Sequence, residues 1–321
     1  MAAYRAVLEV QKFSEEREVL HFQEAVSQTW RKAAQSDELW LCFIYEDKRL
    51  ECGYKCRTKR GREQYKYLHY LNTCLVTITY EEIRFYHCPT GRINRVFALP
   101  RPIYDIGNSA QVLLWDLSLL ITGGGTDINE EHHRKAFRLL EGQIHPIANL
   151  PIGRRCHGIA LWADSVFVFG GLEGTSGCSN SAHEYSFPES LWRPAPSMLN
   201  PRARFCPVTY QAQIYLCGGM FTYDSEVFDP AARVYTPLPF SLPEVSDCAC
   251  VFHAGSLIIA TNGFLAHWNP GEVGISQRRR SDYSCVYGPM NAVALHNSLY
   301  ILGWEGLLCI NIAQASSTKL A

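Results

Sequence analysis

The chain has 321 residues, 47% of them hydrophobic, and a formal net charge of -1 at pH 7. A chain of this size and composition buries one large core, or a small domain beside a large one, which excludes extensive disorder. The nearly neutral charge excludes a general attraction to nucleic acid or anionic lipid. No apolar stretch approaches the roughly 18 residues that span a bilayer, and the N-terminus lacks the apolar core of a signal peptide. We therefore expect a cytoplasmic protein with no nucleic-acid and no membrane partner.

The first predicted unit is helical and covers residues 1–45. Its helical period is carried by four apolar residues spaced 3 or 4 positions apart: Val19, Phe22, Val26 and Trp30. This spacing is the pattern of an amphipathic helix. Residues 46–63 form a connector, in which 51–58 is a candidate β-strand. The sequence thus predicts a small helical unit ahead of a larger domain at 64–321.

The larger domain repeats one pattern, a short apolar run that ends in glycines. The pattern is strongest at 118–125 (SLLITGGG), 165–171 (SVFVFGG) and 213–219 (QIYLCGG). Weaker copies complete a series of six anchor positions: Thr79, Gly123, Gly170, Gly218, Asn262 and Gly303. The steps between anchors are 44, 47, 48, 44 and 41 residues, and a propeller blade takes about 40 to 50. The repeat therefore predicts six blades.

Each repeat contains β-rich runs separated by turn residues, as a four-stranded antiparallel blade requires. The innermost strands are expected at 65–70, 109–114, 156–161, 206–210, 249–252 and 292–295. The outer strand of the last blade is expected at 316–320, or from the connector strand at 51–58. A strand donated by the connector would join the two ends of the domain and remove an open sheet edge.

The third repeat resembles the kelch family most fully. Its matching residues are, in chain order, Gly170, Gly171, Tyr185, Trp192, Pro196, Ser197, Met198, Arg202 and Arg204. The fourth repeat adds Gly218, Gly219 and the Asp229-Pro230 step. A tryptophan-aspartate propeller is the competing all-β fold, but Trp115-Asp116 is a single instance of that pair. The resemblance implies a kelch-type propeller over about 64–321.

The helical segment resembles the F-box in two stretches, 26–31 (VSQTWR) and 36–40 (SDELW). The resemblance implies a Skp-type adaptor of a cullin ubiquitin ligase as partner, contacted by Leu20, Phe22, Val26, Trp30, Leu39 and Trp40. The usual opening Leu-Pro-x-Glu is absent, and a helical cap on the propeller edge is the alternative. The expected fold class is all-β, a six-bladed kelch-type β-propeller with a small N-terminal α-helical F-box-like segment.

No pattern in the chain predicts catalysis, because it has neither a Gly-x-Ser-x-Gly nucleophile motif nor a phosphate-binding glycine loop. The best metal-like cluster is too loosely spaced to predict zinc: Cys52, Cys56, His69 and Cys74. Thirteen cysteines at irregular spacing indicate free thiols in a reducing compartment. We therefore expect no enzyme activity, no metal and no cofactor.

Binding of a target protein is the remaining kind of function, and the kelch resemblance implies which face binds it. In kelch propellers the loops leading into the innermost strands and the loops after the glycine pairs share one face, which binds peptides or proteins. The residues expected on that face are Arg154, Arg155, His157, Arg202, Arg204 and Asp247. Arg155 and Arg204 stand 15 and 14 residues before their glycine anchors, so two guanidinium groups are expected side by side for an acidic or phosphorylated target. The alternative is that these arginines bridge adjacent blades.

Two functions follow from this interpretation. The first is a substrate receptor of a cullin-type ubiquitin ligase that binds its target through the propeller face. The second is a structural kelch scaffold of a cytoskeletal or ciliary assembly without a ligase role. Identifying the proteins that co-purify with the chain separates them.

Overall fold

The computed structural model describes the strands within 74–113 by their backbone, and then residues 118–125, 134–140, 143–174, 177–242, 247–261, 264–279, 291–295, 298–303, 306–311 and 317–319. The predicted helical segment, the connector strand at 51–58 and the first innermost strand at 65–70 lie outside the described residues. The six expected adaptor contacts do too: Leu20, Phe22, Val26, Trp30, Leu39 and Trp40.

The described residues form six antiparallel sheets in chain order and contain no helix. The first sheet consists of β1 (Cys74–Ile78), β2 (Glu82–His87) and β3 (Arg92–Ala98). The second consists of β4 (Ala110–Leu113), β5 (Leu119–Thr122), β6 (Ala136–Leu140) and β7 (Gln143–Pro146). The third consists of β8 (Gly158–Trp162), β9 (Ser165–Phe169), β10 (Ala182–Ser186) and β11 (Leu191–Ala195).

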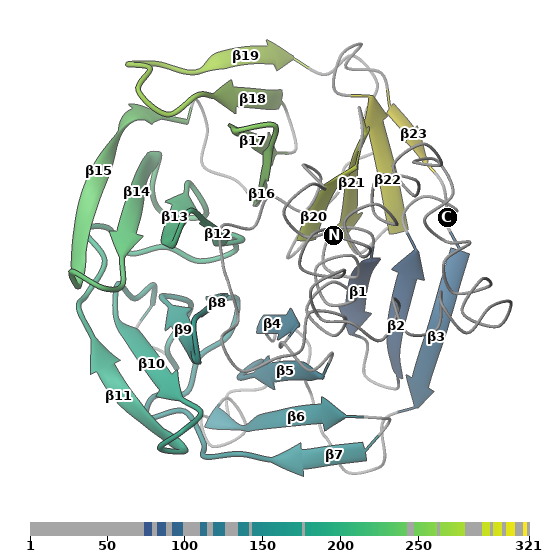
Figure 1. The fold of residues 1–321 in the computed structure, drawn as a ribbon, viewed down its shortest axis with the longest axis vertical. Helices are drawn as coiled ribbons and strands as arrows, with labels where there is room; N and C mark the ends of the chain where they lie inside the picture. The colour runs from purple at the N-terminus through teal and green to yellow at the C-terminus, as the bar shows by residue number, and fades with distance from the viewer. Residues whose placement is uncertain are drawn as a thin grey trace, which may run out of the picture.

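The fourth sheet consists of β12 (Val208–Tyr210), β13 (Gln213–Cys217), β14 (Asp224–Asp229) and β15 (Val234–Ser241). The fifth consists of β16 (Cys248–His253), β17 (Ser256–Thr261), β18 (Phe264–Trp268) and β19 (Ser276–Arg279). The sixth consists of β20 (Asn291–Leu295), β21 (Ser298–Gly303), β22 (Gly306–Asn311) and β23 (Ser317–Lys319). Figure 1 shows the sheets arranged around a common centre, with β4, β8, β12, β16 and β20 nearest to it. These five strands coincide with five of the innermost strands predicted from the repeat.

The first and the last sheet of the chain are in contact with each other. Strand β1 of the first sheet contacts β20 and β21 of the sixth, so the two sheets that are farthest apart in sequence are neighbours in space (Figure 1). Strand β23 pairs with β22 and is the outermost strand of the sixth sheet. Of the two predicted sources for this strand, the C-terminal stretch at 316–320 is therefore confirmed.

The pattern of burial explains why these runs form strands in this order. The second strands of the third and fourth sheets, SVFVF and QIYLC, each bury four successive residues, because neighbouring sheets cover both of their faces. The outermost strands of the third and fourth sheets are largely exposed and carry proline, at Pro194 on β11 and at Pro237 and Pro239 on β15. A proline cannot donate to a further strand, so these edges resist pairing with another chain.

Aromatic rings fill the space between the third and fourth sheets. Phe228 of β14 lies edge-on to Phe167 and Phe169 of β9, with ring centroids 5.4 and 6.0 Å apart. All three side chains are essentially fully buried. Two kelch-like residues of the third sheet, Tyr185 and Trp192, are paired across β10 and β11, with centroids 5.1 Å apart. The predicted repeat residues therefore form the packing between and within sheets.

The glycine pairs adopt one conformation in successive repeats. Gly170 and Gly171 have φ values of 57° and 94°, and Gly218 and Gly219 have 51° and 99°. A side chain is disfavoured at such positive φ, and a Cβ on Gly170 would lie 2.4 Å from the carbonyl oxygen of Arg202. The pair therefore lets the chain leave its strand close to the backbone of the next sheet.

Antiparallel pairing places the connections of each sheet alternately at its two ends. The loops after the glycine pairs and the segments leading into the innermost strands share one end, which we call the glycine end. The turns between the third and fourth strands, such as the one between β14 and β15, lie at the opposite end.

Candidate functional site

The segments leading into β8 and β12 repeat each other at the glycine end. Isolated bridges join Arg155 to Leu172 in one repeat and Ala203 to Met220 in the next. The following residues, Cys156 and Arg204, have positive φ values of 54° and 53°. Arg155 is therefore equivalent to Ala203, and Arg204 to Cys156.

The predicted equivalence of Arg155 and Arg204 is wrong by one residue. Arg204 has positive φ and Arg155 does not, so the positions 15 and 14 residues before the anchor differ in backbone conformation and are not interchangeable. The two segments still lie side by side, because the Arg204 N–H donates to the Cys156 carbonyl at 2.8 Å. The truly equivalent arginines are Arg154 and Arg202, each 16 residues before its first glycine.

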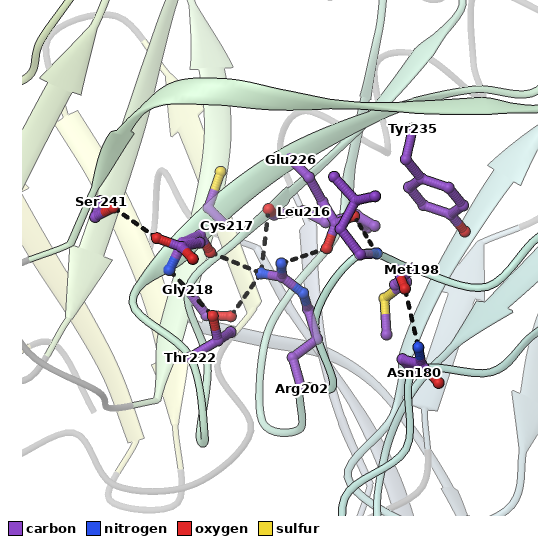
Figure 2. A network of polar contacts seen from close by, with 12 residues as sticks. Asn180, Met198, Arg202, Leu216, Cys217, Gly218, Thr222, Glu226, Tyr235 and Ser241 are labelled. Carbon is purple, nitrogen blue, oxygen red and sulfur yellow. Dashed lines mark hydrogen bonds and ion pairs between the residues drawn. The ribbon is translucent and has the colours of Figure 1, made fainter.

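Arg202 is fully buried inside the fourth sheet (Figure 2). Its Nη1 donates to three carbonyl oxygens at the ends of β13 and β14, those of Leu216, Gly218 and Asp224, at 3.3, 2.8 and 3.1 Å. Its Nη2 donates to Oε1 of Glu226, which is also buried. The other carboxylate oxygen of Glu226 accepts the Leu199 N–H at 2.8 Å. A buried charge is tolerated here because both partners are hydrogen-bonded.

Arg154 occupies the same position in the third sheet and is also fully buried. It donates to the Gly170 carbonyl at 2.9 Å, to Ser181 Oγ at 2.9 Å and to Nδ1 of His183 at 3.1 Å. Its ion-pair partner is Glu173, at 3.3 Å, from the loop after the glycine pair. Burial lowers the pKa of Arg154, and the nearby Glu173 carboxylate raises it.

The two arginines differ in what faces them from the third strand. His183 pairs with Val168, and Glu226 pairs with Leu216, so both stand opposite the residue two positions before the first glycine. The third sheet thus has a histidine where the fourth has a carboxylate. Burial, and then the positive charge of Arg154, lower the pKa of His183 to about 4. His183 is therefore neutral at pH 7 and accepts the bond from the guanidinium.

The backbone of each arginine is bonded to the preceding sheet. The N–H of Gly124 donates to the Arg154 carbonyl at 3.0 Å, and the N–H of Gly171 donates to the Arg202 carbonyl at 2.9 Å. Each buried arginine therefore connects two neighbouring sheets through its backbone and its side chain. This corrects the expectation that Arg154 and Arg202 contact a target, since neither side chain reaches the surface.

His157 and Asp247 are buried as well. Nε2 of His157 lies 2.9 Å from Oγ1 of Thr122, in a hydrogen bond that joins the third sheet to the second. Burial and the charge of Arg154 hold the pKa of His157 well below its usual range. Asp247 lies 3.6 Å from Nη1 of Arg204, whose side chain is 32% exposed. Of the six expected target contacts, Arg155 and Arg204 are the two that solvent reaches substantially, and their target binding stays a prediction.

Sequence reasoning missed the exposed apolar residues at the same end. Seven large apolar residues are exposed in the described part of the chain, and four of them lie at the glycine end: Ile152, Leu199, Phe221 and Tyr223. Phe221 and Tyr223 are 57% and 53% exposed, in the loop that follows Gly218 and Gly219. Two aromatic residues in so short a loop are visible in the sequence, but their exposure is not.

Comparison with known families supports this architecture. Residues 153–199, which include the whole third sheet from β8 to β11, match the Kelch motif. The chain carries a kelch repeat. A relative, the F-box/kelch-repeat protein SKIP30 of Arabidopsis thaliana, is 28% identical over 145 residues. The alignment covers 42% of this chain and 39% of SKIP30, so it spans well under half of that relative.

A solved structure described as the structure of YjhT has a similar fold. It matches with a TM-score of 0.53 and 14% sequence identity, over 63% of this chain and 74% of the other. With the kelch repeat and the ring of antiparallel sheets, this similarity gives a propeller-like fold. Kelch repeats mediate protein–protein interaction, which directs attention to the glycine end.

Other kinds of site have little support in the described residues. No group of three or more His, Cys, Asp or Glu side chains in the described part could hold a metal ion. The cysteines with described side chains are free: Cys156, Cys178, Cys206, Cys217, Cys248, Cys250 and Cys309. Among the same residues, no helix is long and apolar enough to cross a membrane.

Proposed function

We propose that the protein is a binding adaptor that holds a target protein at the glycine end of its propeller. The observation that carries the proposal is the group of exposed apolar residues there, beside the partly exposed Arg155 and Arg204. Apolar residues that gather at one end of a folded surface mark interaction sites, and arginine and aromatic residues dominate binding energies at interfaces.

The proposal includes six blades. Each of the six described sheets is one blade, and the first receives its innermost strand from 65–70. Five sheets have four strands and the first has three, so one further strand completes the series. Residues 64–321 then form the propeller, 1–45 the F-box-like segment and 46–63 the connector.

The finer proposal is a substrate receptor of a cullin-type ubiquitin ligase, acting in the cytoplasm. The F-box-like residues of the N-terminal segment support it, as does the printed name of the relative SKIP30, an F-box/kelch-repeat protein. The segment would bind a Skp-type adaptor through Leu20, Phe22, Val26, Trp30, Leu39 and Trp40. Free, buried thiols such as Cys217 and Cys250 fit the reducing environment in which these ligases act.

Co-expression of the full chain with a Skp-type adaptor and a cullin tests this proposal. We expect the three to co-purify and the Trp30→Ala variant to lose the adaptor, because truncating an interface tryptophan costs about 2 kcal/mol or more. Leu191→Ser, at the opposite end of the third sheet, is the matched control. Failure of the wild-type chain to retain the adaptor would refute the ligase role.

The second candidate is a structural kelch scaffold of a cytoskeletal or ciliary assembly. The observation in its favour is the missing Leu-Pro-x-Glu at the start of the F-box-like segment. In that case the full chain co-purifies with assembly proteins and without a cullin.

We also propose that the protein acts by binding and not by catalysis. The buried polar side chains at the glycine end support this, because they are engaged in joining sheets. Arg154, Arg202 and His157 each bond a neighbouring strand or sheet. Sustained turnover of a ligand by the purified chain would contradict the proposal.

A further inference from the structure

The loop between β13 and β14 presents two aromatic rings to solvent. Phe221 and Tyr223 are exposed, while Thr222 between them is buried. The two rings are separated by one residue, so the short loop exposes both of them at the glycine end. A single exposed apolar side chain is ordinary on a protein surface, but two exposed aromatic residues in one short loop form an apolar surface of the kind found at interaction sites.

Hydrogen bonds hold this loop in place. The Met220 N–H donates to the Ala203 carbonyl at 2.7 Å, and the Leu242 N–H donates to the Tyr223 carbonyl at 2.7 Å. Within the loop, the Asp224 N–H donates to Thr222 Oγ1 at 3.1 Å. The aromatic pair is therefore fixed before any partner binds, which lowers the entropic cost of association.

The backbone at Phe221 is strained. Its φ is 78°, a region that a bulky residue rarely adopts and that costs about 1 to 3 kcal/mol. Glycine would adopt this conformation without strain. The ring contributes little to the core, because it is more than half exposed. The strained position therefore indicates a role of the ring outside the fold.

Charge changes along the radius of the fourth sheet. Arg155 and Arg204 precede the innermost strands, and Arg155 has no side-chain hydrogen bond or ion pair among the described residues. The aromatic loop lies farther out, between the second and third strands. Asp224 follows it and accepts a hydrogen bond from Ser241 of the outermost strand at 2.7 Å. Arg204 is paired with Asp247, so Arg155 supplies the unpaired positive charge near the centre among the described residues. The loop is apolar farther out, and Asp224 places a carboxylate beyond it.

We propose that this surface binds an extended acidic peptide segment of a partner protein, with an aliphatic or aromatic anchor residue. The anchor packs on Phe221 and Tyr223, and a carboxylate of the segment points toward Arg155 near the centre. Asp224 repels carboxylates at the edge and so sets the direction of the segment. This inference rests on the proposed function, which requires only that a protein binds at the glycine end.

The test uses a phage-displayed library of random peptides of about twelve residues, selected on the full chain at low salt. We expect enriched sequences that combine aspartate or glutamate with a large apolar residue. A fluorescent synthetic peptide of the enriched sequence then gives the Kd by anisotropy. Phe221→Gly and Tyr223→Ser should each weaken binding about tenfold or more. Arg155→Gln should weaken it about tenfold and make the Kd less dependent on salt.

Stability measurements exclude loss of folding as the cause. Phe221→Gly should melt at the wild-type temperature or above it, because the substitution removes strain. Leu191→Ser, at the opposite end of the neighbouring sheet, should leave the Kd unchanged. No enrichment, or unchanged affinity in Phe221→Gly and Arg155→Gln, overturns the inference.

The composition of the enriched peptides separates this inference from the proposed function. Basic or uncharged peptides that lose affinity when Phe221 is replaced would retain a binding site at the glycine end and refute the acidic ligand. Peptides that lose affinity only in Leu191→Ser would refute both.

Discussion

The third and fourth sheets bury the same guanidinium at the same position and neutralise it in different ways. In the fourth, Glu226 of strand β14 pairs with Arg202, and both side chains are essentially inaccessible. In the third, a neutral His183 takes that place, and the carboxylate comes from Glu173, 19% exposed in the loop after the glycines. The repeat therefore preserves the arginine and its carbonyl partners, while the source of the counter-charge varies.

The difference decides what each loop can do. Glu173 and Phe221 both stand three residues after the first glycine of their repeats. Glu173 is held by Arg154 and by Ser181 Oγ at 2.6 Å, so its loop is fastened to the sheet. In the fourth sheet the strand already supplies the carboxylate, and the same loop position carries an exposed aromatic ring. Moving the counter-charge from the loop to the strand leaves the loop available for recognition.

The largest expected loss of unfolding free energy comes from removing the carboxylate of Glu226 in β14. Glu226→Gln leaves the buried Arg202 without a counter-charge, and breaking a buried ion pair costs about 3 to 5 kcal/mol. Glu173→Gln should cost about 1 to 2 kcal/mol, because Glu173 is partly solvated and Arg154 keeps its other acceptors. Urea denaturation of both variants measures the difference. Equal losses would show that the two sheets neutralise their arginines equivalently.

The glycine pairs provide a second comparison. An added Cβ on Gly170 would meet the Arg202 carbonyl oxygen at 2.4 Å, whereas on Gly218 it would meet a methyl of Leu242 at 2.3 Å. A leucine methyl can rotate away, but a hydrogen-bonded carbonyl cannot. We expect Gly170→Ala to cost about 2 to 4 kcal/mol and Gly218→Ala about 1 to 2 kcal/mol, the latter mainly from the positive φ. Thermal denaturation that ranks them in the reverse order would contradict this account.

A rescue experiment would convert one arrangement into the other. In the Glu173→Gln background, His183→Glu places a carboxylate where the fourth sheet has Glu226. We expect it to recover about 1 kcal/mol of the lost free energy of unfolding, as a charge-assisted hydrogen bond allows. His183→Gln, which supplies an acceptor without a charge, is the matched control. If the two substitutions have the same effect, the charge at this position is not what stabilises Arg154.

The smallest expected change in the free energy of unfolding near neutral pH comes from the protonation of His183. Its pKa falls from the ordinary 6.5 to about 4 on folding, so protons bind preferentially to the unfolded chain. This contribution to stability is complete above pH 6.5 and is lost as the pH falls from 6.5 toward 4. One proton limits the slope to about 1.4 kcal/mol per pH unit. The free energy of unfolding of His183→Gln should decline less over this range, and parallel curves would contradict the assignment.

Much of the fold could be predicted from the sequence because its signals are local and repeated. The apolar runs that end at Gly123, Gly170 and Gly218 placed the second strands, since these strands end in glycines with positive φ that are visible in the sequence. The spacing also placed the innermost strands β4, β8, β12, β16 and β20. It did not fix the register of the leading segments, where an error of one residue made Arg155 and Arg204 look equivalent.

The sequence by itself determined the all-β repeat and the place of the glycine pairs. Only the tertiary structure decided which side chains at the glycine end are buried and which are exposed. Arginines such as Arg154 and Arg202 are frequent in binding sites, but here both side chains are buried and hydrogen-bonded to carbonyl groups of their own sheets. Phenylalanine is usually a core residue, but the Phe221 side chain is exposed in its loop. Burial depends on contacts between residues distant in sequence, so it cannot be read from the chain itself.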